Sequence, residues 1–194
     1  MARKWYGLFS HTGKELEKLS VSEHVDLRLE AVLTNRAEYE GNLNIRGCVT
    51  HVLGSFQKVN NRLMNPLIVA NDSLITLNGY MGILPAEVLE NLHKRGCKVY
   101  NIHPAPIHLY PELRGKDPQE RMYEGIQKHE YNYIGVVIHE VDAGVDTGKI
   151  VHWVLQLADP NMTKEELYQQ LHDLGTQAWE SFFRERMYEN GENS

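Results

Sequence analysis

Two polar residues in the middle of the chain have the types needed to move protons and to stabilise negative charge. Asn101 and His103 lie in the segment VYNIHP (99–104), which is typical of a strand and its end. Alternation along a strand puts residues i and i+2 on the same face, so both side chains can point into one site. An amide donates to a developing oxyanion, and an imidazole moves protons near neutral pH. The pair alone is also compatible with a polar strand end whose histidine bonds to the backbone.

A carboxylate that suits this pair follows in VVIHEVDAGVDTGKI (136–150), where residues 142–148 form a turn between two apolar strands. Asp146 in this turn can orient the imidazole of His103 and stabilise its charged form, as the carboxylate of a catalytic triad does. Taken alone, the turn is also compatible with an acidic hairpin that has no catalytic role.

The elements that must position these residues alternate between strands and helices. The predicted strands are 4–9, 27–34, 49–53, 73–77, 98–102, 134–141 and 150–157, and the predicted helices are 14–20, 56–64, 85–94, 118–128 and a long one opened by Thr163. This order predicts an α/β fold, a Rossmann-like three-layer domain with a mostly parallel central sheet and helices on both faces. With no repeat or linker visible, residues 1–194 are expected to form one domain. Ligands should bind beyond the carboxyl ends of the strands.

The amino-acid composition disfavours two classes of binding partner, nucleic acids and membranes. The net charge of −6 and the pI near 5.9 disfavour nucleic acid as the main partner. The amino-terminal segment lacks the apolar run of a signal peptide, and no segment reaches the roughly 20 apolar residues that span a bilayer. Two cysteines, Cys48 and Cys97, are expected to be reduced thiols. We therefore expect a soluble, cytoplasmic protein that does not bind membranes.

The ten histidines do not predict a metal site. There is no H-E-x-x-H motif, and the spacing of His103, His108 and His139 matches no known metal signature. The sequence therefore predicts no metal site.

Several ordered motifs add a family resemblance. The chain carries NIHP, then YPELRG, ERMYEG and IHEVDAGVDTGKI, and upstream of these LNGYMGILPAEV. Together they resemble the formyltransferase family that uses 10-formyltetrahydrofolate. The similarity runs from about Lys4 to the final helix and is densest between residues 74 and 150. The chain length suits the compact branch that acts on glycinamide ribonucleotide in purine biosynthesis.

The resemblance implies a role for each candidate residue. Asn101 would stabilise the oxyanion, and His103 would transfer protons and polarise the formyl carbonyl. Asp146 would position His103, together with a bound water, and relay protons. His139 would contact these catalytic residues without touching the substrate. The folate site would comprise Met81, Ile83 and Leu84, largely through backbone groups, and the closing loop Val141, Asp142, Ala143, Gly144 and Val145.

The acceptor side departs from the family pattern. The glycinamide ribonucleotide branch has a first turn rich in glycine and serine that holds a phosphate, whereas here the turn reads SHTGKE (10–15). Thr12, Gly13 and Lys14 are predicted to contact the acceptor, but Glu15 would repel a phosphate. Gly175 stands near the place where that branch carries an acidic residue that engages the amine. The acceptor is therefore left open between glycinamide ribonucleotide and an amino-sugar nucleotide.

Other classes of function stay open as well. Transfer of the formyl group to water, as in formyltetrahydrofolate deformylase, needs the same catalytic core. A non-catalytic folate-binding relative is disfavoured because it needs no proton relay. A dinucleotide-dependent oxidoreductase is disfavoured because the first turn lacks G-x-G-x-x-G. A monomer and a homodimer are both compatible with the sequence.

Overall fold

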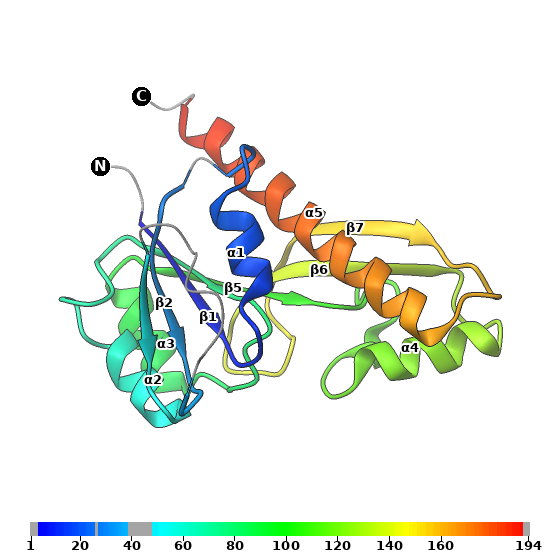
Figure 1. Cartoon of the computed structure of the whole chain (residues 1–194), viewed down its shortest axis with the longest axis horizontal. Coiled ribbons are helices and arrows are strands. Elements are labelled where there is room, and N and C mark those ends of the chain that lie inside the picture. Colours follow the sequence, from blue (N-terminus) through cyan, green and yellow to red (C-terminus); the bar gives the residue numbers. More distant parts are fainter. Residues whose placement is uncertain (1–3, 26, 39–47, 192–194) are drawn as a thin grey trace.

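A seven-stranded sheet forms the centre of the computed structural model, which describes residues 4–25, 27–38 and 48–191 (Figure 1). The strands are β1 (Trp5–Phe9), β2 (Leu29–Thr34), β3 (Val49–Val52), β4 (Leu74–Leu77), β5 (Lys98–His103), β6 (Tyr133–Glu140) and β7 (Ile150–Leu157). The helices are α1 (Lys14–Ser20), α2 (Phe56–Leu63), α3 (Ala86–Lys94), α4 (Pro118–Gln127) and α5 (Lys164–Gly191), with a 3₁₀ turn at Pro111–Leu113.

The strand order is β3-β2-β1-β4-β5-β6-β7. The pairs from β3 to β5 are parallel, whereas β5 pairs with β6, and β6 with β7, in antiparallel fashion. The predicted α/β fold with a mostly parallel sheet is therefore confirmed. The antiparallel half brings the turn after β6 back toward β5.

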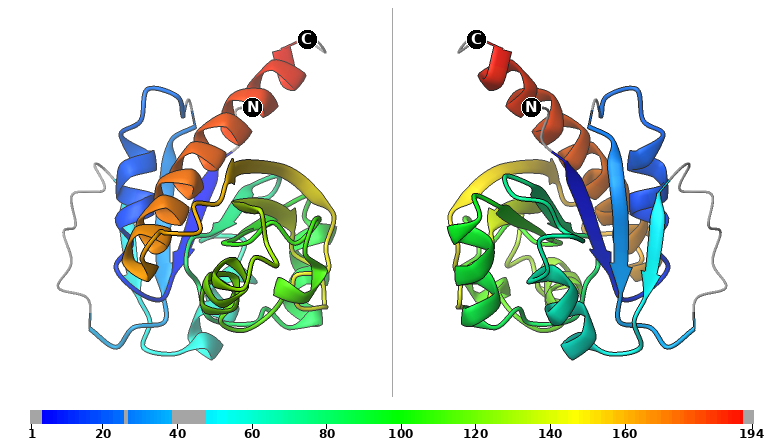
Figure 2. Two further views of the ribbon diagram at one scale, coloured as in Figure 1. Left: turned by 90° about the vertical axis from the view of Figure 1, so that its right-hand side faces the viewer. Right: turned by 90° about the vertical axis from the view of Figure 1, so that its left-hand side faces the viewer.

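Helices cover both faces of the sheet (Figures 1 and 2). Every residue of β1 is buried, and alternate residues face opposite layers. Trp5 and Phe9 belong to a core shared with α1, α4 and α5, and Tyr6 and Leu8 belong to a core shared with α2 and α3. The central strand is thus fixed from both sides, which holds its carboxyl end in place at the rim.

The long final helix begins as the sequence predicts. The Thr163 backbone N–H donates to Glu166 Oε2 at 2.7 Å, and the Glu166 N–H donates to Thr163 Oγ1 at 3.2 Å. This reciprocal pair is a capping box, which satisfies two backbone donors at the helix start. From there α5 packs along β6, β7, α1 and α4. Within the described residues, no helix is long and apolar enough to cross a membrane.

The structure corrects the end of the fifth predicted strand. Its expected end was Ile102, but β5 continues through His103, which pairs with Val137 of β6. The ladder to β6 extends the strand by one residue and buries His103, of which only 3% is exposed. The connection that follows contains the 3₁₀ turn.

Candidate active site

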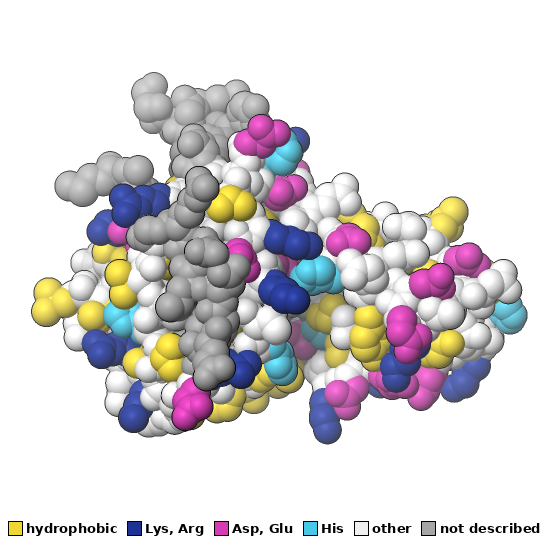
Figure 3. Space-filling view, viewed as in Figure 1, with side chains coloured by type: hydrophobic (Ala, Val, Ile, Leu, Met, Phe, Trp, Pro, Cys, Tyr) yellow, Lys and Arg dark blue, Asp and Glu magenta, His cyan; other side chains and the backbone are white. Residues whose placement is uncertain are grey.

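A cleft of about 870 Å³ lies beyond the carboxyl ends of β1, β4 and β5. The predicted residues that line it are Thr12, Gly13, Lys14, Met81, Ile83, Leu84, Asn101, His103, His139, Val141, Asp142, Gly144, Val145 and Asp146. Ala143 is not among the lining residues. Histidine and lysine or arginine side chains gather near the middle of the face seen in Figure 3. The fold thus brings nearly all of the predicted site residues to one cavity.

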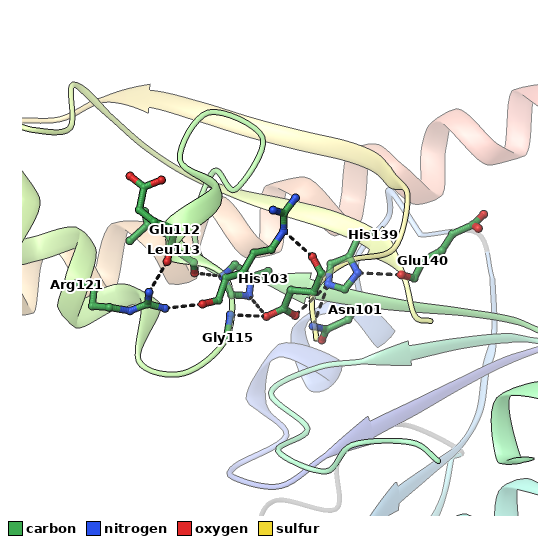
Figure 4. A network of polar contacts seen from close by, with 10 residues as sticks. Asn101, His103, Glu112, Leu113, Gly115, Arg121, His139 and Glu140 are labelled. Atoms are coloured by element: carbon green, nitrogen blue, oxygen red, sulfur yellow. Dashed lines mark hydrogen bonds and ion pairs between the residues drawn. The ribbon is translucent and has the colours of Figure 1, made fainter. Parts of the chain in front are cut away.

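His103 is held at both ring nitrogens (Figure 4). Its Nδ1 lies 3.1 Å from Asp146 Oδ2, and its Nε2 lies 2.8 Å from the Leu113 carbonyl oxygen. Both neighbours are hydrogen-bond acceptors, and they are satisfied together only when both ring nitrogens carry hydrogen. The two acceptors therefore fix the orientation of the imidazole ring beside the cleft.

His139 joins the amide of Asn101 to the carboxylate of Asp146. Asn101 of β5 pairs with His139 of the neighbouring strand β6 in the sheet. His139 Nε2 lies 3.3 Å from Asn101 Nδ2 and 3.4 Å from Asp146 Oδ1, while its Nδ1 lies 2.9 Å from the Glu140 carbonyl. With hydrogen on Nδ1 alone, the ring donates to Glu140 and its Nε2 can accept one N–H of the Asn101 amide, whereas a ring with hydrogen on both nitrogens donates from Nε2 to Asp146. That amide has a second N–H, which is available for a ligand oxygen.

Asp146 sits in the left-handed backbone region, with φ of 53°. Its Oδ2 accepts the Gly115 N–H at 2.9 Å, and its carbonyl accepts Arg114 Nε at 3.0 Å. Burial opposes ionisation of Asp146, but hydrogen bonds from His103 and His139, the charge of His103 and the Gly115 amide outweigh it. The pKa of the carboxyl therefore lies well below its usual range.

The loop that carries Asp146 is held by its own contacts. Asp142 Oδ1 accepts the Gly144 N–H at 3.0 Å and the Thr147 hydroxyl at 2.8 Å. At the other end, a Cβ on Gly148 would lie 1.8 Å from the Glu140 carbonyl oxygen. Only glycine permits this close approach, which closes the loop onto β6.

Gly148→Ala is expected to displace the loop, because the obstructing atom is backbone. We expect the free energy of unfolding to fall by about 1–3 kcal/mol and the cleft to bind its ligand more weakly. Urea unfolding followed by circular dichroism measures the first effect. Gly144→Ala is the matched control, since its Cβ would meet the Thr147 side chain, which can rotate. Equal losses in the two variants would contradict the backbone explanation.

The segment predicted to hold the folate presents large apolar side chains to the cleft. Met81 and Ile83 are 68% and 74% exposed, whereas Leu84 is buried. Exposed apolar side chains that line a concave site are typical of a ligand pocket. The Met81 backbone N–H is already engaged, since it donates to Ser10 Oγ at 2.9 Å. At position 81 the side chain, more than the backbone donor, is therefore available to a ligand.

The structure also adds contacts that the sequence did not predict. The Leu113 carbonyl and the Gly115 amide hold His103 and Asp146, and both belong to the YPELRG motif. Glu15 and Asn78 line the same cleft and contact each other. The motif marks the segment that carries the first two groups, but no local pattern predicts the contacts of either pair. Among the described residues, no cluster of three histidine, cysteine or acidic side chains is arranged to hold a metal ion.

Comparisons with known proteins agree with this architecture. The sequence model of the formyl transferase family matches residues 21–181. A phosphoribosylglycinamide formyltransferase of Schizosaccharomyces pombe is 33% identical over 93 residues, which cover 48% of this chain and 44% of that protein. The aligned segments span less than half of the length of the curated relatives considered.

Two solved structures share the fold. Phosphoribosylglycinamide formyltransferase from Bacillus halodurans superposes with a TM-score of 0.75 at 19% identity, covering 95% of each chain. A formyltetrahydrofolate deformylase from Pseudomonas syringae superposes with a TM-score of 0.75 at 18% identity, covering 97% of this chain and 62% of that one. The family match covers most of the sequence, and the chain therefore belongs to the formyl transferase family.

Proposed function

We propose that this chain transfers the formyl group of 10-formyltetrahydrofolate to a primary amine of a small acceptor. The observation that carries the proposal is the convergence of Asn101, His103 and Asp146 at one cleft, within a chain of the formyl transferase family. Met81 and Ile83, together with the loop 141–146, are suited to hold the folate because they supply apolar contact area at the same cavity.

The proposed chemistry makes one bond and breaks one bond. The amine nitrogen bonds to the formyl carbon, the bond from that carbon to folate N10 breaks, the amine loses a proton and N10 gains one. The second N–H of Asn101 donates to the carbonyl oxygen as its negative charge grows, and His103 stabilises that charge further once it has taken up a proton. Asp146 contacts both His103 and His139, so these three side chains form a network that can accept and return the proton.

Glycinamide ribonucleotide is the acceptor to test first, because the relatives reported above include enzymes named for it. An amino-sugar nucleotide stays the alternative acceptor. Hydrolysis of the donor is the second candidate function, which the deformylase of the same fold favours. No metal is required for either reaction. The monomer or homodimer and the cytoplasmic location expected from the sequence stay predictions.

An assay with purified protein and 10-formyltetrahydrofolate tests the proposal. Formation of tetrahydrofolate is followed with glycinamide ribonucleotide, with amino-sugar nucleotides, with a wider set of primary amines and with no acceptor. Turnover that depends on an amine supports formyl transfer and identifies the acceptor. Equal turnover with and without an amine supports the hydrolase. Failure of every amine to raise turnover would overturn the proposed transfer.

A further inference from the structure

Glu15 places a carboxylate inside the acceptor half of the cleft. It is the second residue of α1, directly after the turn whose contacts with an acceptor the sequence predicts. The residue is partly buried and lines the cavity together with Asn78 and Gly175. Burial raises the pKa of the Glu15 carboxyl, and Asn78, Trp179 and Lys18 offset this only in part. A carboxylate in this position therefore lacks much of the solvation that it would have in water.

One oxygen of the carboxylate is fixed by a chain of hydrogen bonds through the core. Trp5 Nε1 donates to Thr76 Oγ1 at 2.8 Å, and the Thr76 hydroxyl donates to Asn78 Oδ1 at 2.6 Å. Asn78 Nδ2 then donates to Glu15 Oε2 at 2.7 Å. Every donor in this series of hydrogen bonds points toward the Glu15 carboxylate. The core is therefore organised to hold a hydrogen-bond acceptor at this place.

The other oxygen faces a gap in α5. Gly175 has no side chain, and a Cβ there would lie 3.2 Å from Glu15 Oε1 and 3.6 Å from Ile102 Cδ1. Any larger residue at position 175 would crowd the carboxylate. Glu15 and Gly175 both line the cavity, so a ligand there can reach the carboxylate, on which a side chain at position 175 would press.

This carboxylate lies close to the proposed chemistry. Leu77 pairs with Asn101 in the sheet, and Asn78 is the next residue along the chain. Successive side chains of a strand point to opposite faces, so Asn78 faces the α5 layer together with Thr76, whereas Asn101 faces the other layer, and both reach the same cavity at the strand ends. An amine held at Oε1 would approach the formyl group from the acceptor side.

We propose that Glu15 binds the acceptor, accepting hydrogen bonds from its amine or neighbouring hydroxyl groups, and that the part of the acceptor lodged at the first turn carries no phosphate. The inference rests on the proposed formyl transfer and names the acceptor class. An ammonium or hydroxyl donor restores solvation to the carboxylate, whereas a phosphate would bring a second anion against it.

The test compares acceptors that differ only by a phosphate. Glycinamide riboside is paired with glycinamide ribonucleotide, and glucosamine with glucosamine 6-phosphate. We expect the wild type to show a higher kcat/KM with the phosphate-free member of each pair that turns over. Glu15→Gln, which keeps an acceptor oxygen for Asn78, should lower that value about 10- to 100-fold, as expected when a charged hydrogen bond is lost. Glu15→Gln should also reduce the ratio of kcat/KM between the phosphate-free and the phosphorylated acceptor. Glu23→Gln, an exposed residue outside the cleft, is the control.

A preference of the wild type for the phosphorylated members, or an unchanged preference in Glu15→Gln, would overturn the inference. A second measurement needs no turnover. Inorganic phosphate titrated into the isotopically labelled chain is expected to leave the amide resonances of residues 12–15 in place, and saturable shifts there would overturn the inference. Failure of the proposed function gives a different result, since amines would then fail to raise turnover whatever their phosphate content.

Discussion

His103→Ala is expected to lower kcat for formyl transfer by about 10³-fold. The substitution removes the ring proposed to stabilise the carbonyl oxygen and breaks the contact between His103 and Asp146. The apolar contacts at Met81 and Ile83 lie on another segment, so the Kd for 10-formyltetrahydrofolate should change by less than about threefold. Steady-state kinetics and equilibrium binding of the folate measure the two effects separately.

The controls for this experiment address folding. His103 is buried, and its loss leaves the Leu113 carbonyl without its partner. The circular dichroism spectrum and urea midpoint of His103→Ala are therefore recorded beside those of His103→Gln, which retains a side-chain donor. His108→Ala removes an exposed histidine that packs on Trp153 outside the cleft, and it should retain full activity. A folded His103→Ala enzyme with normal kcat would remove this residue from the mechanism.

Asp146→Asn is expected to lower kcat by a comparable factor of about 10³. The carboxylate holds His103 and His139, and an amide can satisfy both rings only by changing their tautomers. Loss of these charged hydrogen bonds should also reduce the free energy of unfolding at pH 7 by about 1–3 kcal/mol. Kinetics and urea unfolding of the two proteins at pH 7 measure both quantities.

The pH dependence of stability gives a sharper test of the same residue. The folded pKa of Asp146 is depressed, so its stabilising contribution is fully present above the unfolded value of about 3.9 and is lost as the pH falls toward the folded value. The difference in unfolding free energy between wild type and Asp146→Asn should therefore be large at pH 7 and smaller at pH 3. A constant difference would show that Asp146 is not held as an ion. Asp173→Asn, on the exposed surface of α5, should show little difference at either pH.

The sequence predicts most of the elements because their signals are local. The alternation of LITL and KVYNI with amphipathic helices, and the Thr163 capping box, suffice to place β4, the start of α5 and all of β5 except its last residue. The direction of β6 has no local signal. A helix between two strands usually accompanies a parallel crossover, yet β6 runs antiparallel to β5. That outcome depends on the path of the chain from residue 104 to residue 132, which tertiary packing decides.

The candidate site also has a part that the sequence predicts and a part that depends on the tertiary fold. Asn101, His103 and Asp146 are predictable from residue type and spacing, together with the family resemblance. Their backbone partners are not, because the Leu113 carbonyl and the Gly115 amide reach the site only through the fold of their loop. Glu15 is a further example of what the sequence can predict. Its place in the first turn indicates that this turn differs from a phosphate-binding turn. Its contact with Asn78 and its proximity to Gly175 require the assembled sheet and α5.

The antiparallel half of the sheet has a consequence for how the molecule folds. β6, β7 and α5 follow one another along the chain and pack together, whereas β1 must pair with β4 across roughly 70 residues. Closing a short loop loses less chain entropy than closing a long one. We expect pulse-labelled amides of β6 and β7 to gain protection before those of β1 and β4. The cleft would then be completed late, when β5 joins a hairpin that already carries Asp146.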